Sequence, residues 1–177
     1  MRASVVDTNV ILVANNAHED VSPECVIACV ERLNELMKSG VLVVDDSFRI
    51  FNEYQHKTSP RAAKGVGDLF VQWALRHNAQ AHRVHQVAIT EVAPDRYAEF
   101  PDDLALESDF DPADRKFVAV AHAHRGYPTI WQAADCKWLD WWQPLKACGV
   151  EVEFLCGSDV CRAYSKKYRN KPMPPLP

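Results

Sequence analysis

The sequence predicts an α/β protein, a three-layer α/β/α sandwich around a central, mainly parallel sheet. Two observations carry this prediction. Short apolar runs such as "VLVV" at 41–44 alternate with stretches in which apolar residues recur at helical spacing. These runs are continuously apolar rather than alternating with polar residues, which is typical of parallel strands covered by helices on both faces. With 177 residues, the chain is long enough for one well-buried domain.

The first half of the chain contains the expected elements in a regular order. Residues 3–6 form a buried strand, and a helix follows over 8–15. Ser22 and Pro23 provide a cap and a first-turn proline for a helix that Gly40 ends. Further elements are a strand at 41–44, helices at 47–57 and 68–77, and an extended segment at 83–90.

The second half begins with a region at 93–110 that is irregular or holds one short helix. Asp111 and Pro112 repeat the cap-plus-proline pattern and start a helix that Gly126 closes. Residues 129–134 form a strand, 135–149 a helix that Pro144 bends or ends, and 150–156 the last strand. The segment 157–177 is predicted to be a basic, proline-rich, solvated tail.

Composition narrows the class of protein. Hydrophobic residues make up 47% of the chain, charged residues 25%, and the net charge is −4, which argues against a protein that coats nucleic acid by bulk charge. No apolar run approaches the roughly 20 residues that span a bilayer, and Asp7 interrupts any signal-peptide pattern. We therefore expect a cytoplasmic protein without membrane association, and reduced thiols at its six cysteines: 25, 29, 136, 148, 156 and 161. Their spacing does not match a zinc site, so buried structural cysteines are expected.

Four carboxylates occupy related places in this scheme. Asp7 follows the first strand, Glu53 lies two turns into the helix after the second, Asp114 lies in the first turn of a later helix, and Asp135 follows the strand at 129–134. Residues just beyond the carboxyl ends of parallel strands line one crevice. Clustered carboxylates repel one another, and a hard divalent cation such as Mg²⁺ or Mn²⁺ reverses that repulsion. The four acids therefore predict a metal-dependent phosphodiester hydrolase.

Each acid also has a simpler explanation. Asp7 and Asp135 are suited to capping the helices that follow them, and Asp114 to a position at a helix amino terminus. Glu53 is compatible with a surface position on its helix. The joint placement of the four acids favours the site over these alternatives.

The sequence also resembles the PIN-domain nucleases. "VVDTNVIL" at 5–12 resembles the opening of that family, and "VLVVDDSFRIFNEY" at 41–54 resembles its second strand and acid-bearing helix. "DRKFVAVAHAHRG" at 114–126 and "TIWQAADCKW" at 129–138 match the segments that carry the third and fourth acids. The resemblance covers 1–156 as a PIN-like domain, with 58–110 longer than a minimal member needs.

This resemblance implies a function and a site. Asp7, Glu53, Asp114 and Asp135 would bind one or two Mg²⁺ or Mn²⁺ ions and cut RNA through metal-activated water. Asn9 would orient the Asp7 carboxylate, and the site-shaping residues would be Thr8, Asn9, Asp111 and Asp140. Family members include toxins of toxin–antitoxin pairs, so an antitoxin, another protein partner and a homodimer are expected forms of association.

Two departures from the family pattern favour an alternative function. Ala133 stands where the family often has Thr or Ser, and Lys137 stands where it often has a second Asp; Asp140 is one helical turn further on. The alternative is a catalytically impaired PIN-fold module that binds RNA or a partner protein. A haloacid-dehalogenase-type phosphatase is disfavoured, because Asn9 occupies the place of its second Asp.

Overall fold

The strands expected from the sequence form one parallel sheet in a computed structural model, which describes residues 3–18 and 20–177. The strand order is β3-β2-β1-β6-β7, and every neighbouring pair is parallel. Ser4 of β1 lies opposite Leu42 of β2 on one side and Thr129 of β6 on the other, so β1 is central. The strand bounds are β1 Ala3–Val6, β2 Val41–Asp45, β3 Val84–Val87, β6 Thr129–Gln132 and β7 Val152–Phe154.

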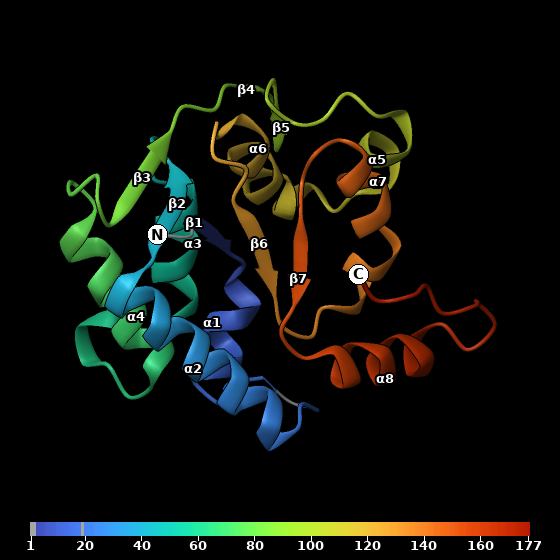
Figure 1. Cartoon of the computed structure of the whole chain (residues 1–177), viewed down its shortest axis with the longest axis horizontal. Coiled ribbons are helices and arrows are strands. Elements are labelled where there is room, and N and C mark those ends of the chain that lie inside the picture. The colour runs from blue at the N-terminus through green and yellow to red at the C-terminus, as the bar shows by residue number, and fades with distance from the viewer. Residues whose placement is uncertain (1–2, 19) are drawn as a thin grey trace.

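Helices cover this sheet and complete the predicted three-layer α/β/α sandwich (Figure 1). Helices α1, α2 and α4 pack on one another, whereas α6 packs across β1, β2 and β6. The α-helices are α1 Thr8–Ala14, α2 Pro23–Ser39, α3 Arg49–Lys57, α4 Val66–His77, α5 Leu104–Asp109, α6 Arg115–Ala123, α7 Trp142–Ala147 and α8 Gly157–Lys167. The 3-10 turns are η1 Pro60–Ala62, η2 Pro112–Asp114 and η3 Cys136–Asp140, and β4 Glu91–Ala93 pairs with β5 Arg96–Tyr97 in a small hairpin.

Local sequence explains the predicted helix boundaries. The Ser22 hydroxyl accepts a hydrogen bond from the Cys25 backbone N–H, Pro23 occupies the first turn, and α2 ends at the Gly40 cap, as expected. All five residues of β2 are buried, in keeping with a strand covered on both faces. At Gly67 in α4 an added Cβ would lie 2.2 Å from the Ile11 carbonyl oxygen, so glycine permits the close approach of α4 to α1.

The expected helix that begins at Asp111 is different in detail. Asp111 and Pro112 start the 3-10 turn η2, and the α-helix begins only at Arg115 and ends at Ala123, before Gly126. The helix expected over 135–149 is likewise split into η3 and α7. Both Asp111 and Asp135 cap a 3-10 turn by accepting from the backbone N–H two residues on, which favours the tighter turn at these starts.

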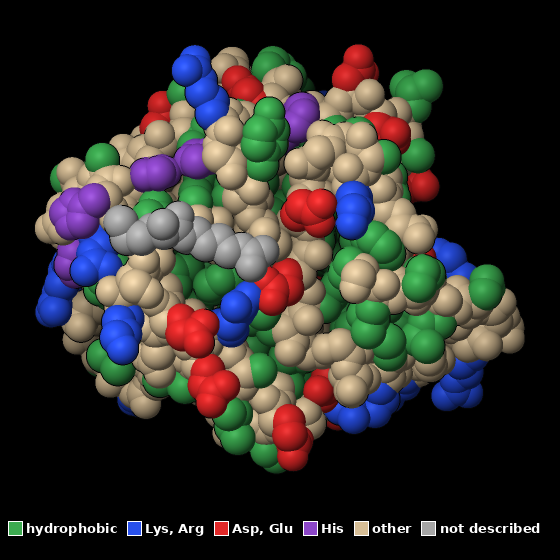
Figure 2. Space-filling view, viewed as in Figure 1, with side chains coloured by type: hydrophobic (Ala, Val, Ile, Leu, Met, Phe, Trp, Pro, Cys, Tyr) green, Lys and Arg blue, Asp and Glu red, His purple; other side chains and the backbone are tan. Residues whose placement is uncertain are grey.

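The segment 58–110 contributes to the central sheet. It supplies α4 and then β3, the edge strand beside β2, before the β4–β5 hairpin and α5. Near this edge, His85 Nδ1 of β3 and His124 Nε2 after α6 lie 2.8 Å apart. Figure 2 shows that the histidines on this face gather over β3.

The carboxyl-terminal segment corrects the expectation of a solvated tail. Residues 157–167 form helix α8, whose Val160 and Tyr164 are buried against Cys136 and Leu139 of η3. Only the residues after α8 extend along the surface without helix or strand. The basic side chains of α8 point outward, and Figure 2 shows Lys and Arg side chains gathered beneath this helix.

The expectation of six reduced cysteines is wrong for two of them. Cys25 of α2 and Cys156, at the start of α8, form a disulfide. The two residues are 131 positions apart in the sequence, and the packing of α2 beside α8 brings their Cα atoms to 5.1 Å, within the reach of a disulfide. The other four, Cys29, Cys136, Cys148 and Cys161, are free thiols.

The sequence was expected to contain no membrane-spanning segment. Across residues 3–18 and 20–177, no helix combines the length and the apolar character that crossing a bilayer requires.

Candidate metal centre

Asp7 lies at the centre of the candidate site. It follows β1 and caps α1 by accepting a hydrogen bond of 2.8 Å from the Asn9 backbone N–H, and only 5% of its surface is exposed. Burial raises the pKa of Asp7 well above its usual value, and the negative charges of Asp114, Asp135 and Glu53 raise it further, whereas the Asn9 N–H opposes the shift. The three predicted partners therefore lie close enough to repel the Asp7 carboxylate.

Asn9 shapes the site in a different way from that implied by the family. Its backbone N–H holds the Asp7 carboxylate, but its side chain is directed to the end of β6. The side-chain nitrogen donates to Gln132 Oε1, and the side-chain oxygen accepts from the Ala133 backbone N–H at 2.8 Å. Asn9 thus fixes the start of α1 against the strand that leads to Asp135.

Glu53 is held by two neighbours. Its carboxylate accepts a hydrogen bond of 2.5 Å from the Thr8 hydroxyl and lies 2.6 Å from the Lys116 ammonium nitrogen. The Lys116 side chain is 9% exposed and that of Glu53 25% exposed, so this ion pair is partly shielded from water. Thr8, predicted as a site-shaping residue, therefore positions Glu53 directly.

Asp114 is the last residue of η2 and precedes α6, and its side chain makes no capping hydrogen bond. Burial and the negative charges of Asp135 and Asp111 together raise the pKa of Asp114 to about 7, although the positive charges of Lys137 and Lys116 oppose this rise.

Asp135 lies near the positively charged side chain of Lys137, which was not predicted to be part of the site. It follows β6 and caps η3 by accepting from the Lys137 backbone N–H at 3.0 Å. The Lys137 ammonium donates to the Asp111 carboxylate. Burial alone would lower the pKa of Lys137, but the bond to Asp111 and the charges of Asp135, Asp111 and Asp114 raise it overall.

Asp140, predicted to shape the site, is engaged elsewhere. Its carboxylate accepts hydrogen bonds of 2.7 Å from the Tyr164 hydroxyl and 2.8 Å from the Lys171 ammonium. These contacts join η3 to α8 and to the extended carboxyl terminus. Asp140 therefore stabilises the packing of α8 rather than extending the acidic cluster.

Sequence reasoning missed the two lysines as members of the site. Lys116 and Lys137 each stand two residues after an acid, in the spacing Asp114-x-Lys116 and Asp135-x-Lys137. Both side chains turn back towards the acids and neutralise Glu53 and Asp111. The repeated Asp-x-Lys spacing is the signal that could have indicated them.

Tyr54 of α3 lies near Asp7 and Glu53, at the buried side of the site. Its side chain is fully buried, and its hydroxyl donates to the Val6 carbonyl oxygen at the end of β1. Burial raises the pKa of Tyr54 well above its usual value, and the charges of Asp7 and Glu53 act in the same direction. Tyr54 therefore stays a neutral hydrogen-bond donor under the acidic cluster.

The donor set fits a hard divalent cation in its chemistry. Asp7, Asp114 and Asp135 offer carboxylate oxygens, and none of them forms an ion pair within the part of the chain that the structure describes. Their oxygens do not yet converge on one point. Among the described residues, the only group of three or more metal-binding side chains with ligand atoms all within 4.8 Å of one another is Cys25, Cys29 and Cys156.

Comparison of the chain with protein-family models, curated proteins and solved structures finds no match. The site is therefore interpreted from its own residues.

Proposed function

We propose that this protein is a divalent-metal-dependent endoribonuclease of the PIN type, which hydrolyses RNA phosphodiester bonds. The observation that carries the proposal is the buried Asp7 carboxylate at the end of the central strand, with a pKa raised by burial and by three other acids. A hard divalent cation stabilises carboxylates that lie close together without a balancing positive charge. The resemblance of the four acid-bearing segments to PIN-domain nucleases supports the same function.

The residues of the chain have distinct roles in this proposal. Asp7, Asp114 and Asp135 would hold a Mg²⁺ or Mn²⁺ ion, which supplies an activated water and neutralises charge on the phosphate. Thr8 and Lys116 keep Glu53 in place at the rim. Lys116 and Lys137 present ammonium groups beside the acids, where either can bind a phosphate oxygen of the substrate.

Cleavage of RNA tests this proposal. A mixed RNA pool incubated with Mg²⁺ or Mn²⁺ should give fragments, and a chelator or the Asp7→Asn variant should abolish cleavage. Asp46→Asn is the matched control, because Asp46 is an exposed aspartate directly after β2 that lies outside the acidic cluster. Cleavage that persists in Asp7→Asn, or that is equally lost in Asp46→Asn, would contradict the proposed site.

One observation favours the second candidate, an impaired PIN-fold module that binds RNA or a partner protein. Lys116 and Lys137 already neutralise Glu53 and Asp111, as a bound cation would. Such a module would retain RNA in a gel-shift experiment without any Mn²⁺-dependent cleavage. The toxin role, an antitoxin partner, a homodimer and a cytoplasmic location stay predictions from the sequence.

A further inference from the structure

Three cysteine sulfurs gather where α2 lies beside the start of α8, and none of the three cysteines belongs to the proposed acidic site. Cys25 and Cys29 lie one turn apart on α2, and Cys156 lies between β7 and α8. Their Sγ atoms all lie within 4.8 Å of one another. The three residues are 2%, 0% and 4% exposed, respectively, so the cluster is shielded from bulk water.

The separation of the sulfurs suits a shared metal ion. Cys29 Sγ lies 3.9 Å from Cys156 Sγ. Two thiolates bound to one ion at about 2.3 Å each, with tetrahedral or trigonal angles, are about 3.8 to 4.0 Å apart. Cys29 and Cys156 are therefore already spaced as two ligands of one ion, and reduction of the Cys25–Cys156 disulfide would free both Cys156 and Cys25 as thiols.

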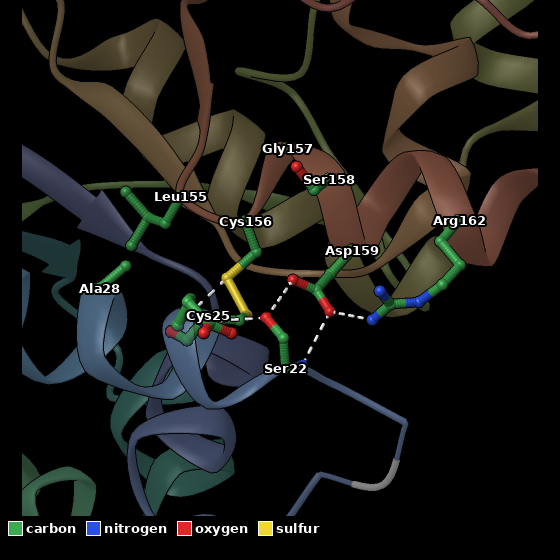
Figure 3. A pocket seen from close by; sticks show the side chains of 10 residues that line it. Ser22, Cys25, Ala28, Leu155, Cys156, Gly157, Ser158, Asp159 and Arg162 are labelled. Atoms are coloured by element: carbon green, nitrogen blue, oxygen red, sulfur yellow. Dashed lines mark hydrogen bonds and ion pairs between the residues drawn. A yellow bond between two sulfur atoms is a disulfide. The ribbon is translucent and has the colours of Figure 1, made fainter.

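A cavity gives access to the cluster from solvent. Its volume is about 520 Å³, and Cys25 and Cys156 form part of its wall (Figure 3). Figure 3 shows Asp159 beside the disulfide, between Ser22 and Arg162. The Asp159 carboxylate accepts from the Ser22 backbone N–H at 2.8 Å and from its hydroxyl at 2.7 Å, which fixes the start of α2 to α8.

We propose that the reduced chain binds one thiophilic cation, such as Zn²⁺ or Cu(I), through the thiolates of Cys25, Cys29 and Cys156. Soft sulfur ligands select such ions, whereas the oxygen ligands of the acidic site select Mg²⁺ or Mn²⁺. The same sulfurs would thus join α2 to α8 in either redox state, by a disulfide when oxidised and by a metal ion when reduced.

A small-molecule dithiol can reduce the Cys25–Cys156 disulfide. The dithiol gives two electrons and two protons to the Cys25–Cys156 bond, becomes a disulfide itself and leaves two thiols on the chain. Binding of the cation then releases the thiol protons to water as the three sulfurs become thiolates. This site is independent of the proposed nuclease function.

The experiment compares the oxidised chain with the reduced chain after the dithiol has been removed without oxygen. Cd²⁺ serves as the optical probe, because its thiolate charge-transfer absorbance in the ultraviolet does not arise from carboxylates. Excess Mg²⁺ keeps the acidic site from competing. Zn²⁺ and Cu(I) are then added separately, and the metal retained after desalting is counted by mass spectrometry.

The reduced chain should show the Cd²⁺–thiolate band and retain one equivalent of Zn²⁺ or Cu(I), whereas the oxidised chain should do neither. Cys29→Ser should weaken binding by at least about tenfold, as loss of a ligand does. Cys148→Ser is the matched control, because Cys148 is a free cysteine outside the cluster.

The proposal is overturned if the reduced wild-type chain retains neither ion or if the oxidised chain binds the ions equally well. It is also overturned if Cys148→Ser loses as much metal binding as Cys29→Ser. The comparison of the oxidised and reduced wild-type chains needs no variant, so it tests the proposal even if Cys29→Ser fails to fold.

Discussion

At the scale of single residues, Asp7 and Asp114 are the two acids of the candidate site that are strongly affected by their surroundings. Both carboxyl groups have raised pKa values, first because they are buried and then because other acids lie nearby. Strand-end reasoning predicted these positions from the sequence. It could not predict that Lys116 and Lys137 turn back into the cluster, because a residue's spacing from an acid does not fix the direction of a long side chain.

The pKa of Asp114 predicts a pH dependence of stability in the absence of divalent ions. Its usual value is 3.8, and in the folded chain it is about 7. Between these values the unfolded chain has released a proton that the folded chain retains, so the Asp114 contribution to the free energy of unfolding falls as the pH rises from about 4 to about 7. Above about pH 7 the Asp114 carboxyl is ionised in both states, and its ionised form continues to destabilise the folded chain by the full amount.

Asp114→Asn should remove this contribution. Urea unfolding at a series of pH values, with a chelator present, should show the variant gaining stability over the wild-type chain from about pH 4 to about pH 7. A difference between the two chains that is the same at every pH would contradict the assigned pKa.

Lys116→Met tests the ion pair with Glu53. The substitution leaves a partly buried carboxylate without its cation, so the free energy of unfolding should fall by about 1–3 kcal/mol. Lys146→Met is the control, because Lys146 lies 3.9 Å from Glu151 with both side chains more than half exposed, and such surface pairs contribute about 0–1 kcal/mol. Equal losses in the two variants would show that the Lys116 contact contributes no more than a surface pair.

At the scale of elements, helices with strong caps and clear periodicity were predicted well, and short or tightly wound elements were not. Helix α2 begins after Ser22 and ends at Gly40 as expected. The segment that forms helix α8 was expected to be a solvated tail because it is rich in Lys and Arg and ends in a proline-rich stretch. In the structure, Val160 and Tyr164 are its buried apolar residues. Two contacts spaced by four residues give a weak sequence signal, and the packing surface on η3 is visible only in the fold.

The Cys25–Cys156 disulfide should contribute strongly to the attachment of α2 to α8. It closes a loop between residues 131 positions apart, and cross-links of such long loops reduce the entropy of the unfolded chain. Reduction, or Cys25→Ser, should lower the free energy of unfolding by about 2–5 kcal/mol in the absence of thiophilic metal ions. Denaturant unfolding of the oxidised and reduced chains measures this. An unchanged midpoint would mean that the cross-link contributes nothing beyond the packing around it.

At the scale of the whole molecule, the parallel sheet explains why the four acids lie near enough to repel one another. Asp7 and Asp135 follow neighbouring strands β1 and β6, and α3 and η2 bring Glu53 and Asp114 to the same edge. The continuous apolar strands made this arrangement predictable, because only a sheet covered on both faces buries them. The Cys25–Cys156 disulfide was not predictable, because the contact between α2 and α8 depends on how distant elements pack.

The central claim is that Asp7, Asp114 and Asp135 form one binding site for a divalent cation, and a thermal titration with Mn²⁺ tests it most directly. At a Mn²⁺ concentration about 100 times its Kd, binding to the folded state adds about 2.7 kcal/mol, which should raise the melting temperature by several degrees. Asp7→Asn should lose this rise while starting from an equal or higher melting temperature, because repulsion is relieved, and Asp46→Asn should keep it. A melting temperature that Mn²⁺ leaves unchanged in the wild-type chain, or raises equally in Asp7→Asn, would contradict the account.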